Sequence, residues 1–417
     1  MSSGGFNVME ENVVGAGQEV HVPDDLVASH PEECSFHGLR MRGGCHCFWD
    51  WEDSAKCSER RMWAASAECL GGSCSNCTQG VCFDPPKEVT ATQRPAVFIY
   101  DLPPGFNQLR PRIAMQRNTP YLLWKRLVSS AHYTTDASQA DFFFVPISAM
   151  GPISHGVIPL AIRYVAQHWP FYNASGGKDH FVVPPWDFGA SWVAGFPGLE
   201  RVRFLSHWGL TERDKRYANT CTLCGPSYVP GKDFVIPDNL EARFARAPPS
   251  DAERTTLLYF AGGPTSDIRA QLLKAGEELM KSRKDVHIVT NDGGNLGHGM
   301  DTSRFCLAPP GAGFGTRATL AVARGCIPVL VGDNIAPVFD GYLDWSTFSL
   351  RLAERDIPQM MSIIDAVSAE DEARLRDAGA PLKRHFVWSE EDSEDAFETT
   401  MLYMLEFKDW DLPTAPR

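Results

Sequence analysis

The chain has 417 residues, of which 43% are hydrophobic, so it is a globular protein large enough for two or three domains. Its formal net charge of -13 at pH 7 argues against nucleic acid or an anionic membrane as the main partner, because both are bound through excess Lys and Arg. A small anionic ligand would therefore need a locally basic pocket.

The first residues of the chain, 1–29, are acidic and are predicted to form a disordered tail. Residues 1–26 contain no apolar run of the length that a signal peptide or membrane anchor needs, so contact with a membrane would require an anchor that is not visible in this chain. Residues 30–84 form a cysteine-rich module, and a polar linker follows over residues 85–94.

The cysteine-rich module has few aliphatic residues, so a hydrophobic core cannot hold it together and covalent cross-links are expected instead. The even number of cysteines favours four disulfide bonds among Cys34, Cys45, Cys47, Cys57, Cys69, Cys74, Cys77 and Cys82. Zinc is the alternative, because Cys45-x-Cys47 and Cys74-x-x-Cys77 have the spacing of metal ligands and His37 and His46 lie nearby.

Short apolar runs that alternate with amphipathic segments predict a first Rossmann-like lobe over residues 95–250. Its expected strands are 96–99, 142–145, 181–183 and 234–236, with a helix over 120–131. Residues 142–162 carry no formal charge, but Pro146, Pro152 and Pro159 would break a membrane-spanning helix. We therefore expect a buried strand followed by a loop in this segment.

A second lobe of the same α/β type is predicted over residues 251–392, followed by a helix and tail over residues 393–417. Its expected strands are 257–260, 286–289, 305–308 and 327–331, with helices over 268–281 and 316–324. Residues 371–406 are predicted to be largely helical, with a break at Gly379 and Pro381.

A glycine-rich turn connects the third strand of the second lobe to the following helix. Its small residues and their neighbours are Gly311, Gly313, Gly315, Thr316 and Arg317. Free N–H groups at a helix N-terminus attract an anion, and glycine lets a phosphate approach the backbone, with Arg317 as an added cation. The alternative is a tight turn that only packs a helix on the sheet.

The other cysteines and one asparagine have simpler interpretations. Cys221 and Cys224 lie in a polar segment and are expected to form a local disulfide, whereas Cys306 and Cys326 are expected to be small buried thiols in or beside two core strands. Asn173-Ala-Ser175 is a glycosylation sequon, which matters only if the chain enters the secretory pathway.

Several ordered motifs resemble the exostosin family of sugar-nucleotide-dependent glycosyltransferases. They are Phe98-Ile-Tyr-Asp-Leu-Pro-Pro-Gly-Phe106, Ala140-Asp-Phe-Phe-Phe-Val-Pro146, Gly177-Lys-Asp-His-Phe181, Tyr228-Val-Pro-Gly-Lys-Asp233, Leu258-Tyr-Phe-Ala-Gly262 with Asp267-Ile-Arg269, and the glycine-rich turn with its continuation to Pro358. The resemblance covers about residues 96–367, and the motifs occur in the family's order.

The resemblance implies a GT-B fold, in which two Rossmann-like lobes face each other across a cleft. It implies a UDP-sugar donor on the C-terminal lobe, held by Arg269 and the glycine-rich turn, and a glycan or glycoprotein acceptor on the N-terminal lobe. Transfer is expected to proceed with inversion and without an obligatory metal or cofactor. The expected location is the Golgi apparatus or the lumen of the secretory pathway.

Inverting transfer needs a base that takes the proton of the acceptor hydroxyl. Asp101, Asp187 and His180 are the candidates, because each falls near the end of an expected strand of the first lobe. For each of the three, a loop cap or a buried hydrogen bond is the alternative.

Leu320 departs from the family pattern Arg-x-x-Glu-Ala, in which the glutamate is thought to help hold the donor. The glycine-rich turn also resembles the Gly-x-Gly-aromatic-Gly variant of algal-type members, so Leu320 is either a subfamily trait or a sign of lost donor binding. The second case gives the alternative function, a catalytically inactive, secreted binding or matrix protein on a transferase scaffold. An epimerase or phosphorylase on the same fold has no distinguishing motif here. The segment around Cys34 and Cys47 resembles an EGF-like repeat, and the oxidising secretory compartment that the family implies favours disulfides over zinc.

Overall fold

A computed structural model of the chain describes residues 38–41, 44–47, 77–78, 81–82, 94–103, 106, 118–147, 153–184, 188–193, 195–212, 226–239, 253–311, 316–389 and 395–409. The chain divides into two compact units, Met1–Arg60 and Arg61–Arg417. In the first unit, strands β1 (Gly38–Met41) and β2 (Gly44–Cys47) pair antiparallel. In the second, β3 (Cys77–Thr78) and β4 (Val81–Cys82) form another antiparallel pair. The predicted disulfides of the cysteine-rich module and the pair Cys221 and Cys224 lie outside the described side chains.

The first large sheet is parallel and buried on both faces. Its strands are β5 (Val97–Ile99), β6 (Phe142–Phe144), β7 (His180–Val182), β8 (Arg203–Ser206) and β10 (Phe234–Val235), in the order β10-β8-β7-β6-β5. Continuous apolar runs are typical of strands covered by helices on both sides. Four of these strands were predicted, whereas β8 was missed because it begins with an arginine and ends with a serine.

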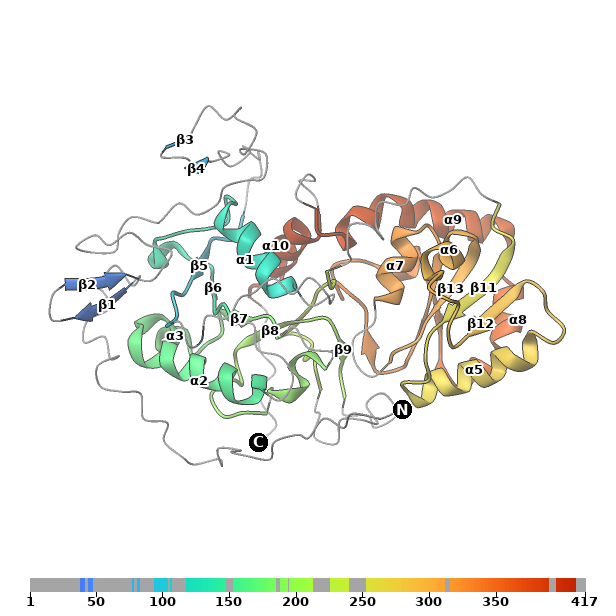
Figure 1. The fold of residues 1–417 in the computed structure, drawn as a ribbon, viewed down its shortest axis with the longest axis horizontal. Helices are drawn as coiled ribbons and strands as arrows, with labels where there is room; N and C mark the ends of the chain where they lie inside the picture. The colour runs from blue at the N-terminus through green and yellow to red at the C-terminus, as the bar shows by residue number, and fades with distance from the viewer. Residues whose placement is uncertain are drawn as a thin grey trace, which may run out of the picture. The chain divides into compact units, whose positions relative to one another are not determined.

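Helices cover the two faces of the first sheet (Figure 1). They are α1 (Thr119–Val128), α2 (Ile153–His168) and α3 (Pro170–Ser175), with short 3-10 turns over Ala137–Gln139 and Gly189–Trp192. The loop expected before Ile162 was wrong, because α2 includes Pro159 in its interior. Burial of the apolar side chains Ile158, Ala161 and Val165 on the sheet outweighs the hydrogen bond that the proline removes.

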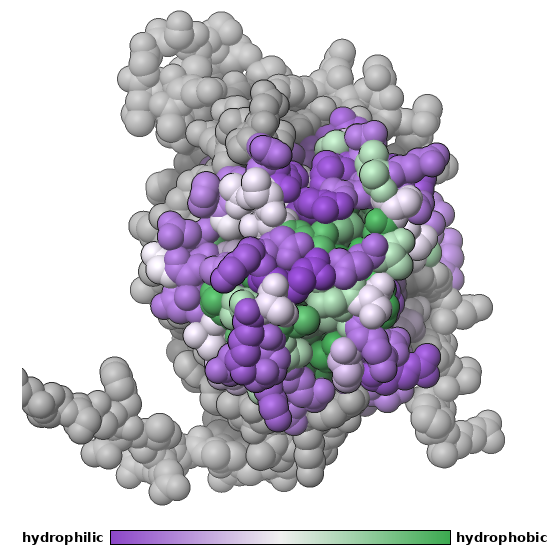
Figure 2. All heavy atoms as spheres, turned by 90° about the vertical axis from the view of Figure 1, so that its right-hand side faces the viewer, coloured by the Kyte–Doolittle hydropathy of each residue, from purple (hydrophilic) through white to green (hydrophobic). Residues whose placement is uncertain are grey.

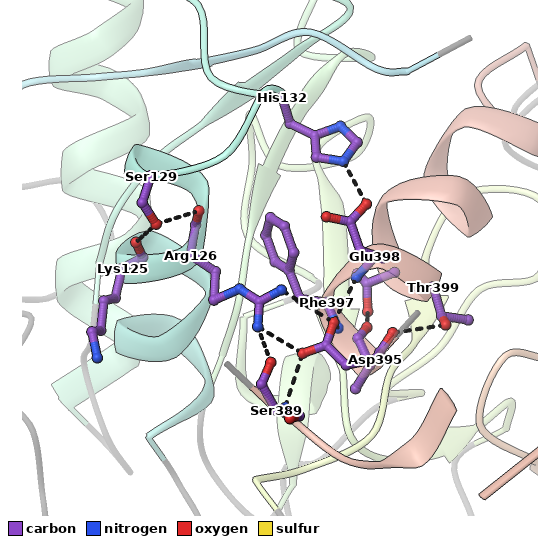
Figure 3. A network of polar contacts seen from close by, with 11 residues as sticks. Lys125, Arg126, Ser129, His132, Ser389, Asp395, Phe397, Glu398 and Thr399 are labelled. Carbon is purple, nitrogen blue, oxygen red and sulfur yellow. Dashed lines mark hydrogen bonds and ion pairs between the residues drawn. The ribbon is translucent and has the colours of Figure 1, made fainter. Parts of the chain in front are cut away.

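The last helix, α10 (Ala396–Glu406), packs on the first sheet, although the second lobe precedes it in the chain. Figure 3 shows the polar contacts that hold its first turn against α1. Asp395 caps the helix by accepting hydrogen bonds from the N–H groups of Phe397 and Glu398, and it forms an ion pair with Arg126 at 2.9 Å. His132 Nε2 lies 2.9 Å from a carboxylate oxygen of Glu398. The end of the chain therefore completes the first lobe.

The second large sheet is also parallel. Its strands are β11 (Thr256–Ala261), β12 (Val286–Val289), β13 (Ser303–Ala308), β14 (Ile327–Val331) and β16 (Leu350–Leu352), in the order β12-β11-β13-β14-β16. Helices α5 (Asp267–Leu279) and α8 (Met360–Asp365) lie on one side, and α6 (Leu296–Asp301) and α7 (Arg317–Ala323) on the other (Figure 1). The predicted α/β class with two lobes is confirmed.

This strand order reverses direction between β11 and β13. From β11 the chain crosses through α5 to β12, then returns through α6 to β13 on the other side of β11. Right-handed crossovers that run in opposite directions leave a crevice at the carboxyl ends of the two strands, where α/β proteins bind their ligands. The reversal therefore marks a candidate ligand site after Ala261 and Ala308.

The remaining elements complete the second lobe and connect it to the first. They are β9 (Gly209–Leu210), β15 (Ile335–Ala336), α9 (Ala369–Gly379), and 3-10 segments Trp345–Thr347, Glu354–Gln359 and Ala380–Phe386. The expected break in the C-terminal helical region is confirmed by the 3-10 segment after Gly379. Strands β9 and β15 pair antiparallel, so each lobe contributes one strand to a small shared sheet.

The solvent-facing side of the second lobe has a polar surface. In Figure 2, hydrophilic side chains cover most of the described surface, and hydrophobic residues are visible between them. Ile363 on α8 is the one large hydrophobic residue in the described part of the second lobe with a markedly exposed side chain, at 38%. Over the described ranges, no helix has both the length and the hydropathy needed to cross a membrane.

The sequence predicts free buried thiols at Cys306 and Cys326. This prediction is wrong, because the two cysteines form a disulfide. Cys306 lies within β13, and Cys326 directly precedes β14, the neighbouring strand, so the backbone brings the two α-carbons to 6.0 Å, within reach of a disulfide. The two cysteines are 20 residues apart in the sequence. Their pairing can be inferred only when the two strands are known to be neighbours.

Replacement of both Cys306 and Cys326 by alanine is expected to lower the free energy of unfolding by about 3 kcal/mol, the effect of a cross-link that closes a loop of this size. Urea unfolding under non-reducing conditions measures the difference. Equal unfolding midpoints for the wild type and the double variant would contradict a stabilising disulfide at this position.

Candidate functional site

Two arginines converge where the second sheet reverses direction. Arg269, on the first turn of α5, is 6% exposed, and its Nη2 donates to the carbonyl of Pro309 at 3.3 Å. Arg317, at the start of α7, donates from Nη2 to the carbonyl of Ala261 at 2.8 Å. The carbonyl groups that orient these guanidinium groups belong to the ends of β11 and β13, so both charges lie at the predicted ligand site.

Two glycines leave room for these guanidinium groups. A Cβ atom on Gly311 would lie 2.8 Å from Cζ of Arg269, and one on Gly262 would lie 2.5 Å from Nη2 of Arg317. Real side chains do not tolerate such distances, so any other residue would displace the arginine. The ring of Phe260 lies 5.8 Å from Cζ of Arg269 and 5.3 Å from Cζ of Arg317, which are cation–π distances.

Among the residues that the structure describes, the two positive charges have no acidic counterpart. Neither guanidinium forms an ion pair with a described residue, and their hydrogen-bond partners are carbonyl or hydroxyl oxygens. Burial and, to a smaller degree, the like charge of Arg317 lower the pKa of Arg269 to about 9, so it remains protonated at neutral pH. Burial also lowers the pKa of Arg317. Two cations without an ion-pair partner in the described part of the chain, Arg269 buried and Arg317 half-buried, form a strong site for a multiply charged anion.

Thr316 connects this site to the first lobe. Its hydroxyl donates to a carboxylate oxygen of Asp238 at 2.9 Å, and Asp238 follows β10 of the first sheet. Asp238 is 4% exposed, and burial raises its pKa to about 7, although the hydrogen bond from Thr316 opposes the shift. A carboxyl group with this pKa changes charge near neutral pH. Asp238 contacts Thr316, which directly precedes Arg317 in the chain.

The raised pKa of Asp238 predicts a pH dependence of stability. An unfolded aspartate has a pKa of about 3.9, so between about pH 4 and pH 7 the native state holds a proton that the unfolded state releases. The unfolding free energy should fall as the pH rises through this range. Asp238→Asn should remove that slope and gain stability relative to the wild type at pH 8, as measured by urea unfolding from pH 4 to pH 8.

Glu278→Gln is the control for this experiment, because Glu278 is an exposed carboxylate on α5. Its stability should follow the wild-type pH profile. Parallel profiles for the wild type and Asp238→Asn would show that Asp238 is ionised at an ordinary pH in the native state.

A second polar pair lies on the other side of β11. Tyr259 donates its hydroxyl to Oδ2 of Asp292, in the segment between β12 and α6. Leu320 is 4% exposed and packs in the same cluster as Tyr259, Ala261 and the Cys306–Cys326 disulfide. Leu320 therefore fills an apolar space and leaves no empty slot where the family pattern has glutamate.

A crevice lies between residues of the two lobes, and its volume is about 70 Å³. From the first lobe it is lined by the segment after β8, with His207, Trp208 and Gly209, and by Val235. From the second lobe it is lined by the ends of β13 and β14 and by Arg317. The carboxyl ends of both sheets therefore border one space, which Arg317 reaches.

His180 is fully buried in the first lobe. Its Nε2 lies 2.7 Å from the hydroxyl of Tyr100, and its Nδ1 lies 2.6 Å from a carboxylate oxygen of Asp179. Burial lowers the pKa of His180, although Asp179 opposes the shift. The ring also stacks on Phe143 at 4.8 Å. With both ring nitrogens engaged by protein groups, the geometry favours the alternative of a structural hydrogen bond.

The structure describes some of the other predicted site residues but not all of them. Asp101 is half-buried just beyond the carboxyl end of β5, and Asn173 is exposed on α3. Asp187, Gly313 and Gly315 lie outside the described residues. The structure thus brings together Arg269, Gly311, Thr316 and Arg317, and it separates them from His180.

Sequence reasoning missed several residues of this region. Asp238 and Asp292 lie outside the family motifs named above, whereas Tyr259 and Gly262 lie in the motif Leu258-Tyr-Phe-Ala-Gly262 but were not assigned to the site. One signal was present, since each lies at or just beyond an expected strand, where parallel sheets bind ligands. In the part of the chain that the structure describes, no three His, Cys, Asp or Glu side chains gather as metal ligands.

Comparison with known proteins agrees with this geometry. Residues 91–367 match the family model of the exostosin GT47 domain. The chain is 29% identical over 302 residues to a probable glucuronosyltransferase of Oryza sativa subsp. japonica, covering 66% of this chain and 68% of that protein. It is 28% identical over 301 residues to the probable beta-1,4-xylosyltransferase IRX10 of Arabidopsis thaliana, covering 66% and 72%.

The similarity to solved structures is low. TarM aligns with a TM-score of 0.34 and 10% identity, covering 60% of this chain and 58% of that chain. The pneumococcal O-GlcNAc transferase GtfA, in complex with UDP and GlcNAc, aligns with a TM-score of 0.31 and 11% identity, covering 62% and 61%. Scores this low carry no functional argument.

Proposed function

The chain belongs to the exostosin GT47 family of glycosyltransferases, and we propose that it transfers a sugar from a UDP-sugar to a glycan or glycoprotein acceptor with inversion. The observation that supports the donor class is the pair of guanidinium groups of Arg269 and Arg317 at the reversal of the second sheet. A nucleoside diphosphate carries the charge that such a pair would balance.

The transfer reaction gives the guanidinium groups of Arg269 and Arg317 a role in stabilising the leaving diphosphate. As the acceptor oxygen attacks the anomeric carbon, the bond from that carbon to the diphosphate breaks and negative charge grows on the leaving oxygen. Oriented cations in a water-poor site stabilise that charge more in the transition state than in the bound donor. We propose that Arg269 and Arg317, rather than a divalent cation, provide this stabilisation, with Thr316 and Gly311 shaping the site.

The acceptor is proposed to bind in the crevice on the side of the first lobe. The segment with His207, Trp208 and Gly209 lines the crevice on this side. The base that takes the acceptor proton is proposed to be Asp101 or Asp187, which follow strands of the first lobe. His180 is a weaker candidate, because both its ring nitrogens already have protein partners.

A location in the Golgi apparatus or the secretory lumen is proposed for this chain. The Cys306–Cys326 disulfide supports it, since such bonds persist in oxidising compartments. Exposure of Asn173 on α3 is compatible with glycosylation of its sequon. Membrane attachment would require an anchor outside the described helices.

The direct test is incubation of the full chain with a panel of UDP-sugars and xylan- and glucuronan-type oligosaccharide acceptors, with release of UDP as the readout. Turnover with at least one donor is expected, and an α/β assignment of the new linkage by NMR tests inversion. If UDP neither binds in calorimetric titration nor is released from any donor, the proposed function is wrong. The pair of arginines, which forms no ion pair with any residue that the structure describes, argues against the inactive scaffold.

A further inference from the structure

The donor nucleotide needs a partner for its ribose, and residue 320 cannot be that partner. Leu320 has no hydrogen-bonding group, and its side chain is buried against Tyr259, Ala261 and the Cys306–Cys326 disulfide. A polar group for the ribose must therefore come from a different element near the carboxyl ends of β11, β12 and β13.

Asp292 is a carboxylate at this edge of the sheet that contacts a side chain of β11. It lies three residues after the end of β12, the strand next to β11. Two contacts orient it, because Oδ2 accepts the hydroxyl hydrogen of Tyr259 and Oδ1 accepts the N–H of Asn295 at 3.1 Å. An ionised carboxylate accepts about four hydrogen bonds. Asp292 therefore keeps acceptor capacity for two more donors after both contacts are made.

The position of Asp292 relative to Arg317 selects the part of the nucleotide that it would meet. Tyr259 and Ala261 point to the same face of β11, and Arg317 donates to the carbonyl of Ala261 at 2.8 Å. Burial, the hydrogen bond to Asp292 and its charge raise the pKa of Tyr259, whereas the charge of Arg317 opposes the shift. Tyr259 thus interacts with both groups, because its hydroxyl contacts Asp292 and its ring system lies within electrostatic range of the guanidinium of Arg317.

In a nucleoside diphosphate, the ribose is bonded directly to the first phosphate, and the base lies one sugar further away. We propose that Asp292 accepts hydrogen bonds from the ribose hydroxyls of the donor nucleotide, and that Tyr259 is the positioning residue that orients it. This inference rests on the proposed function and deepens it, because it assigns the nucleotide-specific contact to a loop residue that lies outside the family motifs named above.

The test compares ligands that differ in one part of the nucleotide. Calorimetric competition measures the dissociation constants of UDP, 2′,3′-dideoxy-UDP, N3-methyl-UDP and pyrophosphate for the full-length protein. The wild type is expected to bind UDP about tenfold or more tightly than the dideoxy analogue, the effect of removing hydrogen bonds to a charged group. In Asp292→Ala, UDP and the dideoxy analogue should bind within about twofold of each other.

Two further variants separate positioning from loss of folding. Tyr259→Phe keeps the ring and loses only the hydroxyl, so it should reduce the discrimination between UDP and its dideoxy analogue without abolishing it. Glu278→Gln, an exposed change on α5, should leave it intact. Affinity for pyrophosphate should be the same in all variants, which shows that the diphosphate site remains folded.

The outcomes that overturn the inference are distinct. Full discrimination against dideoxy-UDP in Asp292→Ala would show that another residue holds the ribose. Loss of discrimination against N3-methyl-UDP instead would assign Asp292 to the base. If the wild type binds neither UDP nor pyrophosphate, the proposed function fails, and this inference fails with it.

Discussion

Arg317→Ala is expected to abolish sugar transfer, with kcat/KM reduced by about a thousandfold or more, in the range found when an arginine that stabilises a transferring phosphate is removed. Arg317 is one of two cations at the reversal of the second sheet, and its guanidinium is oriented by the carbonyl of Ala261 and the ring of Phe260. Initial rates of UDP release with the active donor measure the loss.

The relative changes in kcat and in the affinity for UDP show whether Arg317 stabilises the transition state or only binds the donor. Because the diphosphate charge grows in the transition state, kcat should fall more than the affinity for UDP. Arg317→Lys should recover part of the rate, since it restores the charge without the planar fork of donors. Arg374→Ala, which removes an exposed arginine on α9, is the matched control and should be silent. Near-wild-type turnover by Arg317→Ala would refute the proposed diphosphate site.

Arg203→Ala is expected to cause the largest loss of stability, about 3–5 kcal/mol in the free energy of unfolding, because buried acceptors are left without donors. Arg203 begins β8 and is fully buried. It donates to the carbonyls of Lys178, Phe407 and Lys408 at 2.8, 3.0 and 2.6 Å. It therefore joins the first sheet to the end of α10.

The expected readout is urea unfolding, together with limited proteolysis near the C-terminus. Release of the end of α10 should expose that region to protease in Arg203→Ala before the rest of the chain unfolds. Arg201→Ala removes an exposed arginine two residues earlier and should change stability by less than about 0.5 kcal/mol. Equal midpoints for the two variants would show that Arg203 does not hold α10 to the sheet.

The spacing of apolar residues and the positions of glycine and proline were sufficient to predict most core elements. The runs that became β11, β13 and β14 are largely apolar, and Gly325 ends the helix between the last two. Such runs are mostly buried under helices, so their local pattern identifies them. Elements that mix polar and apolar residues were missed or misread, as β8 and α2 show, because tertiary burial outweighed their local signals.

The residues of the candidate site also fall into two groups, those that the sequence predicts and those that it does not. Arg269, Gly311, Thr316 and Arg317 were predicted from sequence, because a glycine-rich turn and an arginine near a helix start are local features with a direct chemical meaning. Asp238, Gly262, Tyr259 and Asp292 were not assigned to the site, although Tyr259 and Gly262 lie in a family motif, because their own segments do not show which side chains they contact. Their meaning comes from neighbours that lie far away in the chain, such as the contact between Asp238 and Thr316 across 78 positions.

The amino-acid sequence by itself determined the α/β class, the second lobe's glycine-rich turn and the cations beside it, because these depend on short-range periodicity and backbone freedom. The tertiary structure alone decided which strands are neighbours. The strand order placed Ala261 beside Pro309 and paired Cys306 with Cys326, and it brought Asp292 to the same edge as Arg317. Strand order depends on long-range packing, in which the free energy of many buried contacts is shared between segments that no local pattern connects.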